Sequence, residues 1–330
     1  MDPGRAHERG VDGVRVHTVE WDASRAGTHS GRRVLLVHGL GANTISWTPV
    51  ARLLSDGLDA RVTAIDLVGF GRTRALDRAA TITNNRALVE ALLDDTGSAV
   101  VIGNSMGAVI GAGVAARRPE LVDALVLVDP ALPWGRLGPA GWLRLARLAP
   151  LMMPSLGRRA VATRARLIGP ERLVDMTLEM CVTDRSRVDP IVRRRLVHLA
   201  AERYAYPEAA GAYADAARSL LRELAGGDAD RDLGRASELV PTLLVHGEHD
   251  RLVCADLAHE AAHRHPGLDL KVLPGVGHAP QLEVPGRLVE VVTAWLDARM
   301  GSWQAERPGR RDRATVPASS GSPSGSSSTS

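Results

Sequence analysis

The sequence predicts an α/β fold in which buried parallel strands alternate with helices and one long helical segment interrupts them. Short apolar runs rich in β-branched residues recur along the chain and are bounded by Gly, Asp, Asn or Pro. Their apolarity is continuous rather than alternating, which indicates burial on both faces, as in a parallel sheet. Helical patterns lie between several of these runs, and only helical patterns fill the stretch from Ala131 to about Ser237.

The strands and helices of the sheet domain follow from these patterns. The predicted strands are Val34–Val37, Val62–Ile65, Ala99–Ile102, Leu125–Val128, Leu243–Val245 and Leu270–Leu273. Apolar residues at helical spacing predict helices at Arg86–Asp95, Val109–Arg118 and Pro285–Arg299. Proline ends the second helix and begins the third. Such alternation is typical of a mostly parallel sheet covered by helices.

The segment between the fourth and fifth predicted strands, residues 131–237, is predicted to form an all-helical cap. Its amphipathic stretches are Trp142–Leu148, Ser155–Ile168, Glu171–Val182, Asp189–Glu202 and Tyr213–Leu224. A long insertion often supplies an enzyme's substrate pocket; the alternative is that it only adds bulk. The core would then comprise residues 11–130 and 238–300. Residues 1–10 and the Ser-rich tail 301–330 are predicted to be disordered.

Composition excludes several classes of protein. The chain is 45% hydrophobic and 24% charged, which is ordinary for a globular protein. Two cysteines cannot build a disulfide scaffold. No apolar run is long enough to span a membrane, and the first residues lack a secretory pattern, so a cytoplasmic protein is expected. The Arg-rich middle segment carries interspersed acids and few aromatics, which favours a solvated surface over a nucleic-acid site.

Residues Gly103–Gly107 read Gly-Asn-Ser-Met-Gly and fit the pattern G-x-S-x-G. The pattern follows a predicted strand and precedes a predicted helix, which is where it carries a nucleophilic serine. A sharp turn there lifts the side chain of Ser105 clear of the backbone, and the two glycines let strand and helix approach closely. The following helix N-terminus favours developing negative charge. We therefore predict Ser105 as a nucleophile.

A serine hydroxyl needs a base to act as a nucleophile, and His278 is the best candidate. It lies in a Gly-rich loop directly after the last predicted strand. The base in turn needs an orienting carboxylate. Asp250, which follows the fifth predicted strand, is the preferred acid. Glu248 in the same loop and Asp129 after the fourth strand remain open as alternatives.

An acyl-transfer site also needs two backbone N–H groups that hold the oxyanion. Met106, which follows the nucleophile, is predicted to supply one. The Gly-rich stretch His38-Gly-Leu-Gly-Ala42 after the first predicted strand is predicted to supply the other, from Leu40. No metal-binding spacing or nucleotide-binding loop stands out, so neither a metal nor a cofactor is expected.

The order Ser105, Asp250, His278 resembles that of the α/β-hydrolase family, and specifically its cap-bearing serine hydrolases of the esterase and lipase type. The resemblance covers roughly residues 11–300 and includes His38-Gly39 and the turn Asp66-Leu-Val-Gly-Phe-Gly-Arg-Thr73. It implies an eight-stranded, mostly parallel sheet with a cap inserted after the sixth strand.

The resemblance also sorts the possible reactions. Haloalkane dehalogenases and epoxide hydrolases use a carboxylate nucleophile at this turn, so Ser105 disfavours both. The motif Gly-Asn-Ser-Met-Gly is similar to the corresponding motif of carbon–carbon hydrolases that act on ring-fission products. Those usually carry a longer oxyanion loop and a Trp after the catalytic histidine, whereas Ala279 stands here. Carboxylesterase, lipase, lactonase and cofactor-free perhydrolase activities remain.

The substrate is predicted to be an apolar, ester-like small molecule. Leu and Met crowd the start of the cap, where they would form an adaptable apolar wall. Trp47, Phe70, Trp134 and Met152 are candidate pocket residues, although each could equally fill core space. The preferred hypothesis is a serine hydrolase that forms an acyl-enzyme. The alternatives are a carbon–carbon hydrolase, a perhydrolase and a non-catalytic ligand receptor, because a fold does not fix a function.

Overall fold

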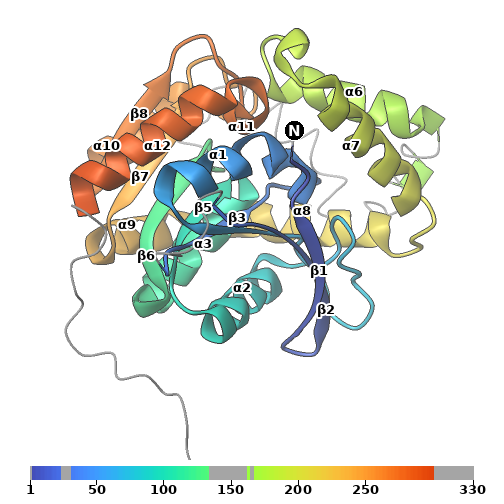
Figure 1. Ribbon diagram of the computed structural model, residues 1–330, viewed down its shortest axis with the longest axis horizontal. Coiled ribbons are helices and arrows are strands. Elements are labelled where there is room, and N and C mark those ends of the chain that lie inside the picture. The colour runs from blue at the N-terminus through green and yellow to red at the C-terminus, as the bar shows by residue number, and fades with distance from the viewer. Residues whose placement is uncertain (1, 24–30, 134–161, 164–166, 301–330) are drawn as a thin grey trace, which may run out of the picture.

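The computed structural model describes residues 2–23, 31–133, 162–163 and 167–300. Eight strands form one sheet in the order β1-β2-β4-β3-β5-β6-β7-β8 (Figure 1). The strands are β1 Arg5–Val11, β2 Val14–Trp21, β3 Arg33–Val37, β4 Arg61–Ile65, β5 Ala99–Asn104, β6 Val122–Val128, β7 Thr242–Gly247 and β8 Leu268–Leu273. All pairings from β4 through β8 are parallel, and β2 joins this sheet antiparallel to β4. The predicted eight-stranded, mostly parallel sheet is confirmed.

The N-terminal residues form a hairpin, so the predicted disorder of residues 1–10 is wrong from Arg5 onward. β1 pairs antiparallel with β2 along its whole length. The turn between them is Asp12-Gly13, with positive φ angles of 46° and 75°, the backbone that a tight hairpin needs. β1 is a largely exposed edge strand with few apolar residues. The sequence analysis predicts neither β1 nor β2, because β1 has no buried apolar run and polar residues interrupt the apolar ones along β2.

Two layers of helices cover the two faces of the sheet. Along β3, Val34 and Leu36 face an apolar cluster that includes α1 (Thr48–Leu58) and α12 (Pro285–Met300). Leu35 and Val37 point to the opposite face. That second face is covered by helices α2 Ile82–Thr96, α3 Met106–Arg117, α9 Asp228–Leu239 and α10 Ala255–Arg264. Burial on both faces is the physical reason for the continuous apolarity of the strands.

The described residues between β6 and β7 form helices joined by short loops and contain no strand. They form α6 Pro170–Cys181, the short 3-10 helix η3 Arg185–Arg187, α7 Pro190–Arg203, α8 Ala209–Gly226 and α9. The predicted stretches Glu171–Val182, Asp189–Glu202 and Tyr213–Leu224 coincide with α6, α7 and α8. The stretch Trp142–Leu148, most of Ser155–Ile168 and the Ser-rich tail lie outside the described residues.

Helix α9 belongs with the sheet domain, so the predicted cap boundary at residue 237 lies too late in the chain. α9 packs along α3, and Arg117 of α3 forms an ion pair with Asp232 of α9 at 2.6 Å. The Nε atom of Arg235 donates to the carbonyl of Ala116 at 2.9 Å. The mostly polar sequence of α9 does not indicate that this helix packs on the sheet domain, because only a narrow apolar stripe that includes Leu233 and Ala236 enters the core.

Helices α6 and α7 lie side by side, away from the strands of the sheet (Figure 1). Their inner faces share a separate apolar cluster that includes Leu178, Val192 and Leu199. This cluster also contains Ile45 of the 3-10 helix η1 (Thr44–Trp47) and Leu282 of α11 (Pro280–Glu283). The insertion therefore packs onto the loops that follow β3 and β8. Among the described helices, none has both the length and the apolarity that crossing a bilayer requires.

Candidate active site

Ser105 stands on a strained turn between β5 and α3. Its backbone angles are φ 53° and ψ −113°, a conformation that L-residues rarely adopt. The turn is held from both sides, because the N–H of Ser105 donates to the carbonyl of Val128 and the carbonyl of Ser105 accepts from Ala108. The side chain is partly exposed rather than buried. This is the geometry expected of a nucleophile elbow.

Both glycines of the motif are required by close packing. A Cβ atom on Gly107 would lie 2.2 Å from the carbonyl oxygen of Val37, and one on Gly103 would lie 2.4 Å from the carbonyl oxygen of Gly107. Strand β3, the elbow and helix α3 can approach this closely only without side chains. The glycines therefore set the height at which Ser105 stands above the sheet.

Replacing Gly107 by alanine is expected to lower the free energy of unfolding by about 3 kcal/mol or more, because the new methyl group meets rigid backbone. Urea unfolding followed by circular dichroism measures this. Gly286→Ala is the matched control, since no atom lies within 4 Å of the added Cβ; its change should stay within about 0.5 kcal/mol. Equal stability of the Gly107→Ala variant and the parent would contradict the packing described for the elbow.

His278 and Asp250 form a buried hydrogen-bonded pair. His278 Nδ1 lies 2.6 Å from Asp250 Oδ2. The other oxygen of Asp250 accepts from the N–H groups of Leu252 at 2.7 Å and Val253 at 3.0 Å. Burial acts to raise the pKa of Asp250, but the hydrogen bond and charge of His278 and these two N–H groups outweigh it and hold the pKa below its ordinary value. Asp250 is thus an ionised acceptor that orients the imidazole.

Asn104 links the elbow to the histidine. Its side-chain amide donates to the carbonyl of Val128 at 3.0 Å and to the carbonyl of His278 at 3.2 Å. The residue immediately before Ser105 therefore holds the main chain of His278. The sequence shows Asn104 only as a variable position of the motif, and its role follows from the way β5 and the loop after β8 meet in space.

The loop after β3 lies against the elbow, where an oxyanion donor is needed. A Cβ atom on Gly39 would lie only 3.1 Å from Cβ of Ser105. Leu40, the predicted donor, follows Gly39 and is half-buried, and Met106 is the first residue of α3. The buried His38 ring fixes this loop: its Nδ1 lies 2.8 Å from the carbonyl of Gly39. Its Nε2 lies 3.1 Å from the N–H of Leu67 and accepts from it.

Asp129, the alternative acid, lies next to the pair but makes a different contact. Its Oδ1 accepts from the N–H of Gly247 at 2.8 Å, which ties β6 to β7. One oxygen of Asp129, one of Asp250 and one ring nitrogen of His278 lie within 4.8 Å of one another. Burial, and then the charge of Asp250, raise the pKa of Asp129 well above its ordinary value. Two carboxyls this close do not both ionise readily, so Asp129 holds its proton to a higher pH than an ordinary carboxyl group.

The Asp129→Asn variant is expected to keep its activity and to lose less stability than the parent as the pH rises. In the parent, the folded state holds a proton that the unfolded state releases. The stabilisation from that proton is complete below the ordinary carboxyl pKa and is lost as the pH rises through the raised folded pKa. Asparagine removes this loss. Urea unfolding should therefore favour the variant more at about pH 8 than at about pH 4; the opposite trend would contradict a protonated Asp129.

The structure places two of the predicted pocket residues in the core. Trp47 has no exposed surface and packs in the apolar cluster beside α1 and α12. Phe70 is 2% exposed and meets His38 edge-on, with ring centroids 5.6 Å apart. Both positions correspond to the alternative in which the aromatic ring fills core space. Trp134 and Met152 lie outside the described residues.

The fold is that of an α/β hydrolase. Residues 34–291 match the model of the alpha/beta hydrolase family, and the chain belongs to that family. A 2-hydroxy-6-oxo-6-(2'-aminophenyl)hexa-2,4-dienoic acid hydrolase of Metapseudomonas resinovorans is 28% identical over 88% of this chain and 91% of its own length. A pimeloyl-[acyl-carrier protein] methyl ester esterase of Nitrosomonas europaea is 28% identical over 81% of this chain and 96% of its own length.

Solved structures show the same fold. The haloalkane dehalogenase DbeA from Bradyrhizobium elkani superimposes with a TM-score of 0.71, covering 89% of this chain and 98% of its own. Its sequence identity is 21%, so this likeness concerns the fold alone.

Proposed function

We propose that this chain is a serine hydrolase that cleaves a carboxylic ester or a related acyl bond of an apolar small molecule. The observation that carries the proposal is the bond by which Asn104, the last residue of β5, holds the carbonyl of His278. It links the loop of the buried His278–Asp250 pair to the residue that directly precedes the strained, partly exposed Ser105. We extend the proposal to a cytoplasmic enzyme that needs neither metal nor cofactor.

The proposed reaction has two halves. The Oγ atom of Ser105 attacks the substrate carbonyl while the Nε2 atom of His278 takes its proton, and Asp250 stabilises the imidazolium. The N–H groups of Leu40 and Met106 hold the oxyanion, a contribution of about 3 kcal/mol per donor in other enzymes. The proton of His278 then passes to the leaving alkoxide, which departs. Water, deprotonated by His278, releases the acid and restores Ser105.

A carbon–carbon hydrolase is the second candidate, and a specific comparison favours it. The relative from Metapseudomonas resinovorans is named for such a dienoic acid substrate and aligns over most of both chains. Against it, Ala279 follows His278, and the oxyanion loop is short. A perhydrolase would use the same residues with hydrogen peroxide in place of water.

Hydrolysis of a p-nitrophenyl ester series from acetate to palmitate tests the proposal, with an aryl 2-hydroxy-6-oxohexa-2,4-dienoic acid as the competing substrate. Ester turnover with a clear optimum in chain length supports an esterase. If the dienoic acid is preferred by about 100-fold in kcat/KM, the esterase proposal would give way to that of a carbon–carbon hydrolase. Failure with both, together with no labelling by a fluorophosphonate, would favour the non-catalytic receptor.

A further inference from the structure

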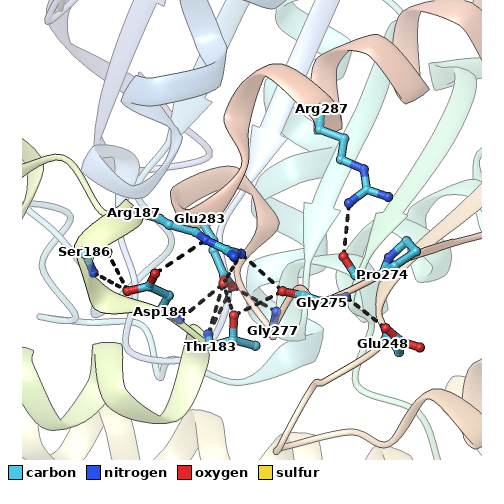
Figure 2. A network of polar contacts seen from close by, with 10 residues as sticks. All are labelled: Thr183, Asp184, Ser186, Arg187, Glu248, Pro274, Gly275, Gly277, Glu283 and Arg287. Atoms are coloured by element: carbon cyan, nitrogen blue, oxygen red, sulfur yellow. Dashed lines mark hydrogen bonds and ion pairs between the residues drawn. The ribbon is translucent and has the colours of Figure 1, made fainter.

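The side chain of Glu283, at the end of α11, is fully buried and surrounded by hydrogen-bond donors (Figure 2). It accepts from the N–H groups of Thr183 at 3.2 Å, Asp184 at 3.3 Å and Gly277 at 2.9 Å. The hydroxyl of Thr183 and the guanidinium of Arg187 contact the same carboxylate. Burying an ion is unfavourable unless it is paired and hydrogen-bonded, and these contacts satisfy that requirement.

The donors come from two segments that are distant in the sequence. Thr183, Asp184 and Arg187 belong to the insertion, between α6 and α7, whereas Gly277 precedes His278. The same two segments meet again at the carbonyl of Gly275, which lies 3.1 Å from Oγ1 of Thr183 and 3.2 Å from Nη1 of Arg187. Figure 2 shows the carboxylate of Glu283 between the insertion and residues 274–279, the loop that carries His278 and is called the histidine loop below.

The main chain is held at His278 and at the residue on each side of it. The N–H of Gly277 donates to Glu283, and the carbonyl of His278 accepts from Asn104. The N–H of Ala279 donates to the carbonyl of Cys181 at the end of α6. Two of these three bonds therefore depend on Glu283 or on the insertion. A Cβ atom on Gly277 would lie 2.7 Å from the Cys181 carbonyl oxygen, so the contact is tight.

We propose that Glu283 is a positioning residue for His278, and that it makes the position of the base depend on residues 181–187 of the insertion. This proposal rests on the proposed function, because it assigns a consequence to the placement of His278. A carboxylate is required at position 283 because the three backbone N–H groups and the guanidinium that face it can only donate. A glutamine amide would oppose two N–H bonds to those donors and leave one oxygen to accept.

The test compares kcat and KM of the parent, Glu283→Gln and Thr183→Val with the best ester of the series. Glu283→Gln is expected to lower kcat by about 10- to 100-fold, because a shift of the base of about 1 Å has effects of that size. KM should change little, since Glu283 lies behind the loop rather than in contact with substrate. The rate of fluorophosphonate labelling should fall in parallel with kcat. Thr183→Val, which preserves shape, should show a smaller loss in the same direction, and Thr183→Ser should restore the parent rate.

Arg193→Ala is the matched control. Arg193 pairs with Asp175 and Glu171 and so joins α7 to α6 without reaching the histidine loop. Circular dichroism checks that each variant is folded, and Thr183→Val keeps the test usable if Glu283→Gln does not fold. Parent-like kcat in the folded variants would overturn the proposal, as would an equal loss in Arg193→Ala. A parent that neither hydrolyses esters nor reacts with the fluorophosphonate would instead refute the proposed function.

Discussion

Ser105→Ala is expected to lower kcat toward the best ester by about 10⁶-fold, as loss of the nucleophile does in a serine protease. Alanine can adopt the backbone of the turn but lacks the hydroxyl oxygen that is proposed to form the acyl-enzyme. Steady-state hydrolysis of the best p-nitrophenyl ester measures the loss, and circular dichroism confirms the fold.

Ser98→Ala is the matched control for this substitution. Ser98 is a half-buried serine directly before β5, at the end of that strand opposite Ser105. Its removal should leave kcat unchanged. Substantial turnover by the Ser105→Ala variant would show that the ester is cleaved by some other group.

Asp250→Asn is expected to lower kcat by about 10⁴-fold while leaving the fold intact. The carboxylate lies 2.6 Å from Nδ1 of His278. In the proposed mechanism it accepts the Nδ1–H and leaves Nε2 free to take the proton of Ser105. An amide in its place can donate to Nδ1 and hold the opposite tautomer, which cannot take the serine proton. The measurement is again kcat with the best ester, over a range of pH.

Comparison with the double variant separates Asp250 from its neighbour. If Asp250→Asn loses less than about tenfold and Asp129→Asn/Asp250→Asn loses much more, Asp129 would be the supporting acid. The structure predicts the reverse, because Asp129 is engaged with the N–H of Gly247. The double variant should therefore be no less active than Asp250→Asn alone.

The parallel strands could be predicted from sequence because burial on both faces requires continuous apolarity. β5 and β7, for example, are buried along their whole length. β1 could not be found this way, since its order comes from main-chain pairing with β2 rather than from buried side chains. The sequence does not predict helix α9, for a related reason. Its contact with α3 combines a narrow apolar stripe with one ion pair and one hydrogen bond to a backbone carbonyl, and neither polar contact can be read from the apolar pattern of the sequence.

The nucleophile, base and acid candidates could be named because each follows a strand of the parallel sheet, β5, β8 or β7. Parallel strands bring their carboxyl ends to the same edge of the sheet. The residues that support these candidates, Asn104 and Glu283, could not be predicted from the sequence. Asn104 and Glu283 act through the main chain of the histidine loop, and nothing in their local sequence indicates which backbone groups they meet. Trp47 illustrates the opposite error, since an aromatic residue near a site loop can point into the core.

The central claim is that Ser105 is an activated nucleophile, and covalent labelling tests it most directly. The protein would be treated with a fluorophosphonate and examined by intact-mass and peptide mass spectrometry. The account predicts a single adduct on the peptide containing Ser105, absent from Ser105→Ala and slow to form in Asp250→Asn. An unlabelled parent protein, or an adduct on another residue, would contradict it.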